Sequence, residues 1–217
     1  MANVSSGTVT KLRASDGALL GTFPAGLSPF GIAFDGANIW VANQLSNAVT
    51  KLRASDGAIQ GVFAVGSFPR QLAFDGSSIW VTNEFSGTVS KLRASDGAPQ
   101  GTFEAGPSPF GIEFDGASIW VTNVDFGTIT RLRASDGLFQ DTFDVGSTPT
   151  GMAFDQAHIW VSNFESVGHA TRVRTRDDAG QKTYPVGSRP IDVVFDGASI
   201  WVSNLDSNTL TKFSGNR

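Results

Sequence analysis

The sequence predicts an all-β protein assembled from short strands that recur with a period of about 40 residues. Each of its five tryptophans lies in an Ile-Trp-Val phrase, which an Asn follows two residues after the Val. Their spacings are 40, 40, 40 and 41 residues, at Trp40, Trp80, Trp120, Trp160 and Trp201. A second phrase, Lys-Leu-Arg-Ala-Ser-Asp-Gly, recurs in the same register at residues 11–17, 51–57 and 91–97, and at 131–137 with Arg in place of Lys. Because no helical periodicity accompanies these phrases, they predict a β-propeller.

One repeat resolves into four strands, which we call A to D from the innermost to the outermost. Strand B carries the Ile-Trp-Val phrase, whose β-branched and aromatic residues favour a buried strand. An Asp-Gly pair between strands A and B is a strong hairpin signal, and a second Asp-Gly pair joins strands C and D. In the first complete repeat the expected strands are residues 31–34, 38–42, 48–53 and 59–63.

The two ends of the chain predict how the array closes. The chain begins with strands C and D at residues 8–13 and 19–23, and it ends with strands A, B and C at 191–195, 199–203 and 209–213. We therefore expect a single domain over residues 1–217 with five four-stranded blades. The N-terminal strands, within residues 1–24, would pair with the C-terminal strands, within 187–217, and one strand C is surplus. A chain cut from a longer array, or a ring completed by a second copy, would show the same strands.

Composition excludes several classes of function. The net charge of −4 gives no general attraction to nucleic acid or to anionic membranes. There is no cysteine, so disulfides and thiolate metal sites are excluded. We expect no membrane span, because no run of about 18 apolar residues occurs, and no signal peptide at the start of this chain. No cofactor or metal is expected.

Most recurring polar and aromatic residues have a structural interpretation. We expect the tryptophans to pack in the core, although sugar stacking is the alternative, and the repeated Asn residues to cap strand ends. The paired cations of strand C, such as Lys51 and Arg53, should pair with aspartates of nearby turns, the alternative being a belt for a polyanion. Turn chemistry explains the aspartates of the Asp-Gly pairs better than Ca²⁺ binding does: Asp16, Asp35, Asp56, Asp75, Asp96, Asp115, Asp136 and Asp196.

Residues that depart from the repeat are the candidates for function, since the consensus is needed for folding. The D–A and B–C loops share one face of a propeller, and there the repeats differ most, with these loop candidates: Phe30, Phe68, Arg70, Phe85, Phe110, Phe164 and Arg189. On the inner strands, Gln71 and Asp192 replace a Gly, and Glu113 replaces an Ala. We expect an anionic or hydrogen-bonding group near Arg70 and Arg189. The alternative is that both arginines pair with Glu84, Glu113 or Asp206.

The repeat resembles the bacterial YVTN-type propeller repeat in its phrases Trp-Val-Thr-Asn at 80–83, Gly-Thr-Val-Ser-Lys-Leu at 87–92, Val-Gly-Ser-Phe-Pro at 65–69 and Gly-Ile-Ala-Phe-Asp-Gly at 31–36. That resemblance implies a propeller, a secreted or periplasmic location, and the roles of surface proteins and interaction scaffolds. The chain is also distantly similar to virginiamycin B lyase-like propellers, but it has Asn where their Trp-Phe-Thr-Glu phrase has Glu, and it has fewer blades.

These observations favour a non-enzymatic binding or scaffold propeller that presents its loop-rich face to a protein or a small molecule. One alternative is a lectin-like sugar binder with one site per blade. Another is a lyase or hydrolase that uses Glu113, Asp192 or His169 in the channel mouth. His158 and His169 stand at unrelated repeat positions, so they predict neither a metal site nor a catalytic triad. The sequence leaves the oligomeric state open.

Overall fold

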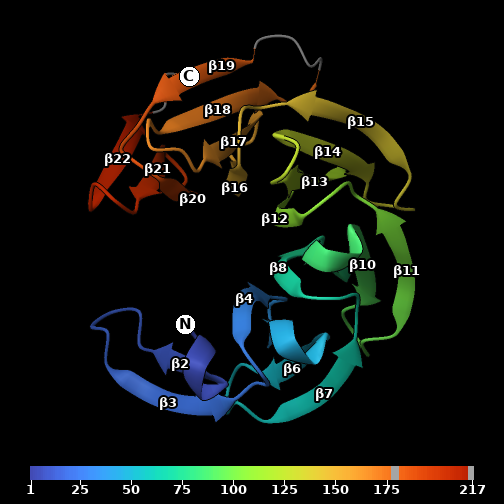
Figure 1. The fold of residues 1–217 in the computed structure, drawn as a ribbon. Helices are drawn as coiled ribbons and strands as arrows, with labels where there is room; N and C mark the ends of the chain where they lie inside the picture. The colour runs from blue at the N-terminus through green and yellow to red at the C-terminus, as the bar shows by residue number, and fades with distance from the viewer. Residues whose placement is uncertain (177–180, 215–217) are drawn as a thin grey trace. The chain divides into compact units, whose positions relative to one another are not determined.

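A computed structural model describes residues 1–176 and 181–214 of the chain (Figure 1). The chain divides into two compact units, unit 1 over Met1–Glu104 and unit 2 over Ala105–Arg217. Every sheet lies within one unit and is antiparallel. The predicted all-β class is thus confirmed, and in the described ranges no helix is long and apolar enough to cross a membrane.

Unit 1 contains three sheets, each formed by strands that follow one another in sequence. The first has three strands, β1 (Ala2–Asn3), β2 (Thr8–Leu12) and β3 (Leu19–Pro24). The second is β4 (Pro29–Phe34), β5 (Asn38–Asn43), β6 (Ala48–Arg53) and β7 (Ile59–Ala64). The third is β8 (Pro69–Phe74), β9 (Ser78–Asn83), β10 (Thr88–Arg93) and β11 (Pro99–Glu104). Short 3₁₀ turns connect strands B and C here: η1 (Val4–Ser6), η2 (Gln44–Ser46) and η3 (Glu84–Ser86).

Unit 2 also contains three sheets of the same kind. Its first sheet is β12 (Pro109–Phe114), β13 (Ser118–Asn123), β14 (Thr128–Arg133) and β15 (Phe139–Asp144). Its second is β16 (Pro149–Phe154), β17 (His158–Asn163), β18 (His169–Arg174) and β19 (Lys182–Pro185). Its third has three strands, β20 (Pro190–Phe195), β21 (Ser199–Asn204) and β22 (Thr209–Ser214).

The four-strand interpretation of the repeat is confirmed, with strand ends one or two residues away from the expected positions. Strand A begins at the proline rather than two residues after it, as β4 shows, because a bulge lies between Pro29 and Ile32. The Asp-Gly turns close the hairpins as predicted: Gly36 has a φ of 96°, which a residue with a Cβ rarely adopts.

The predicted closing sheet is not among the six sheets of the described residues, so the count of five blades is not confirmed. The reason is local pairing. The closure needed β2 beside β21, which is strand B of the last repeat. However, β1 already pairs with β2 at Ala2↔Val9 and Asn3↔Thr8. On the other side, β22, the surplus strand C, pairs along the whole length of β21. The last three residues of the predicted closing segment, 215–217, lie outside the described part.

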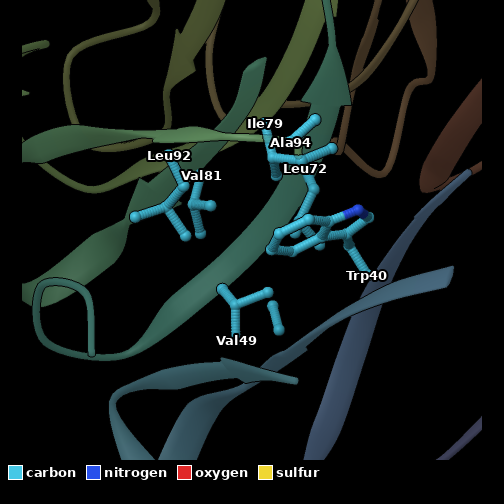
Figure 2. Close-up of a cluster of buried hydrophobic side chains, with 8 residues drawn as sticks. Trp40, Val49, Leu72, Ile79, Val81, Leu92 and Ala94 are labelled. Atoms are coloured by element: carbon cyan, nitrogen blue, oxygen red, sulfur yellow. The ribbon is translucent and has the colours of Figure 1, made fainter. Parts of the chain in front are cut away.

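The tryptophans lie in the core, as expected. Trp40, Trp80 and Trp120 are fully buried and Trp160 nearly so, whereas Trp201 is half-buried. Figure 2 shows the cluster in unit 1 where Trp40 from one sheet lies beside Leu72 and Ile79 from the next. A buried indole between sheets excludes these four side chains as exposed sugar platforms.

Each Asp of an A–B turn has a second role that turn chemistry alone did not predict. Asp75 accepts hydrogen bonds from the backbone N–H groups of Ser77 and Ser78 and, at 2.7 Å, from the indole N–H of Trp80. Burial alone would raise the pKa of Asp75, but these hydrogen bonds outweigh it and hold the pKa below its usual range. The same indole bond recurs at Asp35, Asp115, Asp155 and Asp196.

The two cations of strand C have different partners. Arg53 pairs at 2.9 Å with Asp56 of the following turn, as predicted, and three other repeats show the same pair. Lys51 instead is buried, with its ammonium 5.0 Å from the Trp40 ring centre. It donates to the backbone oxygens of Ala94 and Ser95 in the next sheet. The predicted ion pair is therefore wrong for the first cation, which ties one sheet to its neighbour.

Candidate functional site

The D–A turn and the B–C loop of each repeat are joined by a backbone hydrogen bond. In the second complete repeat the carbonyl of Phe68 accepts the N–H of Glu84 at 3.1 Å, and in the last one the carbonyl of Arg189 accepts the N–H of Leu205 at 2.9 Å. Both carbonyl residues are left-handed, with φ of 57° at Phe68 and 49° at Arg189. A side chain before proline rarely adopts this conformation. The turn therefore fixes the direction of these two predicted site residues.

Five residues of unit 1 form what we call the Arg70 cluster: Phe30, Phe68, Arg70, Glu84 and Phe85. The Arg70 guanidinium lies 5.2 Å from the Phe30 ring centre and 4.7 Å from that of Phe68, and it pairs with Glu84. The rings of Phe68 and Phe85 stack at 4.3 Å with an 11° interplanar angle. The structure therefore brings four predicted site residues together and adds Glu84.

Gln71 belongs to the inner strand β8 rather than to the Arg70 cluster. Its backbone N–H donates to the Thr82 hydroxyl at 3.0 Å. A Cβ added at Gly31 would lie 2.3 Å from the backbone oxygen of Arg70 and 2.9 Å from the side-chain oxygen of Gln71. The backbone of β8 therefore requires the small consensus residue on β4, and the same residue leaves space for the Gln71 side chain.

In unit 2, Arg189 lies 5.5 Å from the Phe164 ring centre and its Nε is 3.4 Å from an Asp206 carboxylate oxygen. Arg70 and Arg189 thus each meet an acid of a B–C loop. This is the pairing stated as the alternative to an anion site, so we do not retain the anion prediction at these two guanidiniums. Phe110, the remaining loop candidate, is half-buried on β12.

The charge of Asp192, one acidic departure of unit 2, acts on Glu113, the other. Burial raises the pKa of Glu113 on β12 to about 7; the N–H of Phe114 opposes this, and the charges of Asp192 and Asp115 add to it. Burial also raises the pKa of Asp192 on β20, although more than a third of that residue's surface stays accessible. Between them lies β16, where Gly151 is so close that a Cβ there would lie 2.5 Å from Asp192 Oδ1.

The remaining candidate for catalysis, His169, begins β18 and lies 3.7 Å from a Glu165 carboxylate oxygen. Within residues 1–176 and 181–214 it has no hydrogen bond or ion pair with Glu113 or Asp192. No three His, Asp or Glu side chains in these ranges are grouped to hold a metal ion. His169 and the two inner acids thus do not form a nucleophile–base constellation.

Apolar residues of the B–C loops are the part of the site that our emphasis on phenylalanines missed. Every B–C loop that follows a complete strand B exposes a large apolar side chain. They are Leu45, Phe85, Phe126, Val167 and Leu205, with exposed fractions of 67%, 69%, 69%, 70% and 52%. Aligning the repeats would have shown an apolar residue in every one of these loops.

Comparison with known proteins gives structural matches alone. The chain matches no protein-family model, and no curated protein matches it in sequence. A streptogramin B lyase structure aligns with 96% of this chain and 72% of its own, at a TM-score of 0.79 and 20% identity. The hydrazine synthase of Kuenenia stuttgartiensis aligns with 99% of this chain and 91% of its own, at a TM-score of 0.76 and 14% identity. A chain of the mitotic checkpoint complex aligns with 97% of this chain and 71% of its own, at a TM-score of 0.85 and 14% identity.

The fold is a β-propeller. The repeated antiparallel sheets and the likeness to propeller structures over nearly the whole chain establish this. At 14–20% identity the likeness carries the fold and not the activity of those proteins.

Proposed function

We propose that the protein is a non-enzymatic binding propeller, a single array over residues 1–217 that presents its D–A and B–C loops to a partner. The observation that carries this proposal is the exposed apolar side chain in each of these B–C loops. Scattered exposed apolar residues are ordinary on a protein surface, but a large exposed one in the B–C loop of every complete repeat is not.

The Arg70 cluster has the composition of an interface centre. Aromatic and arginine side chains contribute most to binding at protein interfaces, especially when they are already ordered before the partner arrives. Phe85 is exposed, while its stacking on Phe68 limits its rotamers. Arg70 is oriented by Glu84 beneath the rings. A partner with an apolar patch would gain contact area at little cost in side-chain entropy.

The test compares Phe85→Ser with Phe139→Ser. Phe139 is a matched control because it is 63% exposed, close to the 69% of Phe85, but lies on the outermost strand β15. With each variant immobilised and exposed to extract of the source organism, we expect Phe85→Ser to lose at least about tenfold of specifically captured protein or small molecule. The Phe139→Ser variant should capture as much as the parent. Equal capture by all three proteins would contradict the proposal.

The alternatives predict different results from other measurements. A lectin would bind members of a glycan array, yet four of its five expected stacking residues are buried. A lyase or hydrolase is supported only by the raised pKa of Glu113. An enzymatic proposal would replace the binding proposal if turnover is lost in Glu113→Gln but retained in Phe85→Ser.

A further inference from the structure

A cavity of about 920 Å³ opens in unit 2 between the sheet β16–β19 and the last sheet, β20–β22. Six of the side chains that line it carry the argument: Gln156, His158, Trp160, Arg172, Tyr184 and Phe213. None belongs to the D–A or B–C loops. The cavity is therefore separate from the surface proposed above.

Four of these residues depart from the repeat, and the cavity brings all four together. Gln156 occupies the place of Gly in the Asp-Gly turn and His158 that of Asn or Ser, while Tyr184 replaces a Phe and Phe213 a Leu or Val. Gln156 keeps the left-handed backbone of its glycine counterparts, with φ of 77° beside 99° at Gly116. A glutamine there costs on the order of 1 kcal/mol of backbone strain. Departures for folding alone would not be expected to converge on one cavity and include a strained residue.

Three aromatic rings make one wall of the cavity. Trp160 stacks with Tyr184 at 5.2 Å and with Phe213 at 5.3 Å, and the latter two rings are 5.4 Å apart. In the other complete repeats the Trp has one such ring partner, as for Trp120 with Phe143. Since Tyr184 and Phe213 stay partly exposed, the wall can accept a flat apolar group.

Arg172 places a cation against this wall. Its guanidinium is 5.5 Å from the Trp160 ring centre and 5.7 Å from that of Tyr184. The equivalent cations Lys51 and Arg131 donate to backbone oxygens of the next sheet. In residues 1–176 and 181–214 no oxygen takes that place for Arg172. In these ranges the Nε atoms of Arg172 and Arg131 are both buried without a hydrogen-bond partner, so the two arginines differ in their terminal nitrogens, of which Arg131 donates one to Thr175. A guanidinium N–H without an acceptor is costly, and a ligand oxygen in the cavity would satisfy the terminal nitrogens of Arg172.

The one carboxylate in the cavity is already committed to the protein. Asp155 accepts hydrogen bonds from the Trp160 indole and from the N–H groups of Ala157 and His158. Burial alone would raise its pKa, but these bonds and the charge of His158 keep the pKa low. It orients Trp160 and His158 and leaves the guanidinium of Arg172 to a ligand.

We propose that this cavity binds a small anion with a flat ring. Its phosphate or carboxylate group pairs with Arg172, and its ring stacks on Tyr184 and Phe213. His158 at the rim supplies a further polar contact.

Isothermal titration calorimetry at low ionic strength with phenyl phosphate, benzoate and inorganic phosphate tests the proposal. We expect saturable binding of phenyl phosphate or benzoate, tighter than binding of inorganic phosphate. Arg172→Lys should weaken it about tenfold, because lysine keeps the charge but loses the planar fork. Arg131→Lys is the matched control, since that arginine already has an acceptor in Thr175, and it should bind as the parent does.

Phe213→Leu restores the repeat residue and separates the two halves of the proposal. It should weaken the binding of phenyl phosphate several-fold and leave the affinity for inorganic phosphate unchanged. Circular dichroism melting identifies any variant that is unfolded, in which case Tyr184→Phe, which keeps the ring, serves as the folded reference. Absence of saturable binding to the parent, or equal affinities of Arg172→Lys and the parent, overturns the proposal.

Discussion

Replacing Trp120 with Ala is expected to lower the free energy of unfolding by about 3–5 kcal/mol. Trp120 is fully buried in unit 2, with its ring 5.5 Å from that of Phe143 and its indole N–H bonded to Asp115 at 2.7 Å. Truncation leaves a cavity among Ile129, Met152 and their neighbours in the same cluster. It also leaves the Asp115 carboxylate without its indole donor, which adds to the loss.

Urea denaturation followed by circular dichroism measures this effect, with Trp201→Ala as the control. Trp201 occupies the same repeat position but is half-buried, so its truncation should cost clearly less. A loss below about 1 kcal/mol for Trp120→Ala would mean that this indole is exposed, and it would restore the sugar-platform interpretation.

Replacing Glu113 with Gln is expected to stabilise the protein at neutral pH by about 2–3 kcal/mol. Burial raises the pKa of this carboxyl from 4.5 to about 7. The folded state therefore keeps a proton that the unfolded chain releases, and stability must fall as the pH rises from about 4.5 to about 7. The glutamine keeps the shape and removes this dependence.

Denaturation at pH 4.5 and pH 8 provides the comparison. The parent and Glu113→Gln should be similar at the lower pH and differ at the higher one. Asp192, whose pKa is also raised, contributes a fall of its own with rising pH in both proteins. If the difference in stability between the parent and Glu113→Gln is the same at both pH values, Glu113 is not desolvated.

Local sequence signals predicted the sheets well, because each strand carries its own. The Ile-Trp-Val phrase predicted the buried strand B, and the Asp-Gly pairs predicted the hairpins beside it. The sequence could also have predicted the hydrogen bond that Trp80 donates to Asp75, since Asp and Trp recur five residues apart in every repeat. It could not have predicted the terminal pairing, because β21 can pair with either of two equivalent C strands and the repeat does not distinguish them.

The candidate site was predicted only in part. Loop variability identified Phe68, Arg70 and Phe85, which contact one another in the structure. It did not identify the cavity beside Arg172, because the departures there lie on strands and on a turn far apart in the sequence. Only the packing of β17, β18, β19 and β22 reveals that Gln156, Tyr184 and Phe213 line one space.

The central claim is that the repeat consensus builds the fold while exposed loop departures build the binding surface, and the stability of Phe85→Ser tests it most directly. Phe85 is 69% exposed and stacks on one ring, Phe68. Urea denaturation should show a loss of at most about 1 kcal/mol, the worth of one aromatic pair. A loss of about 3 kcal/mol, as for a phenylalanine in a core, would contradict the claim, because the Arg70 cluster would then be part of the folding core.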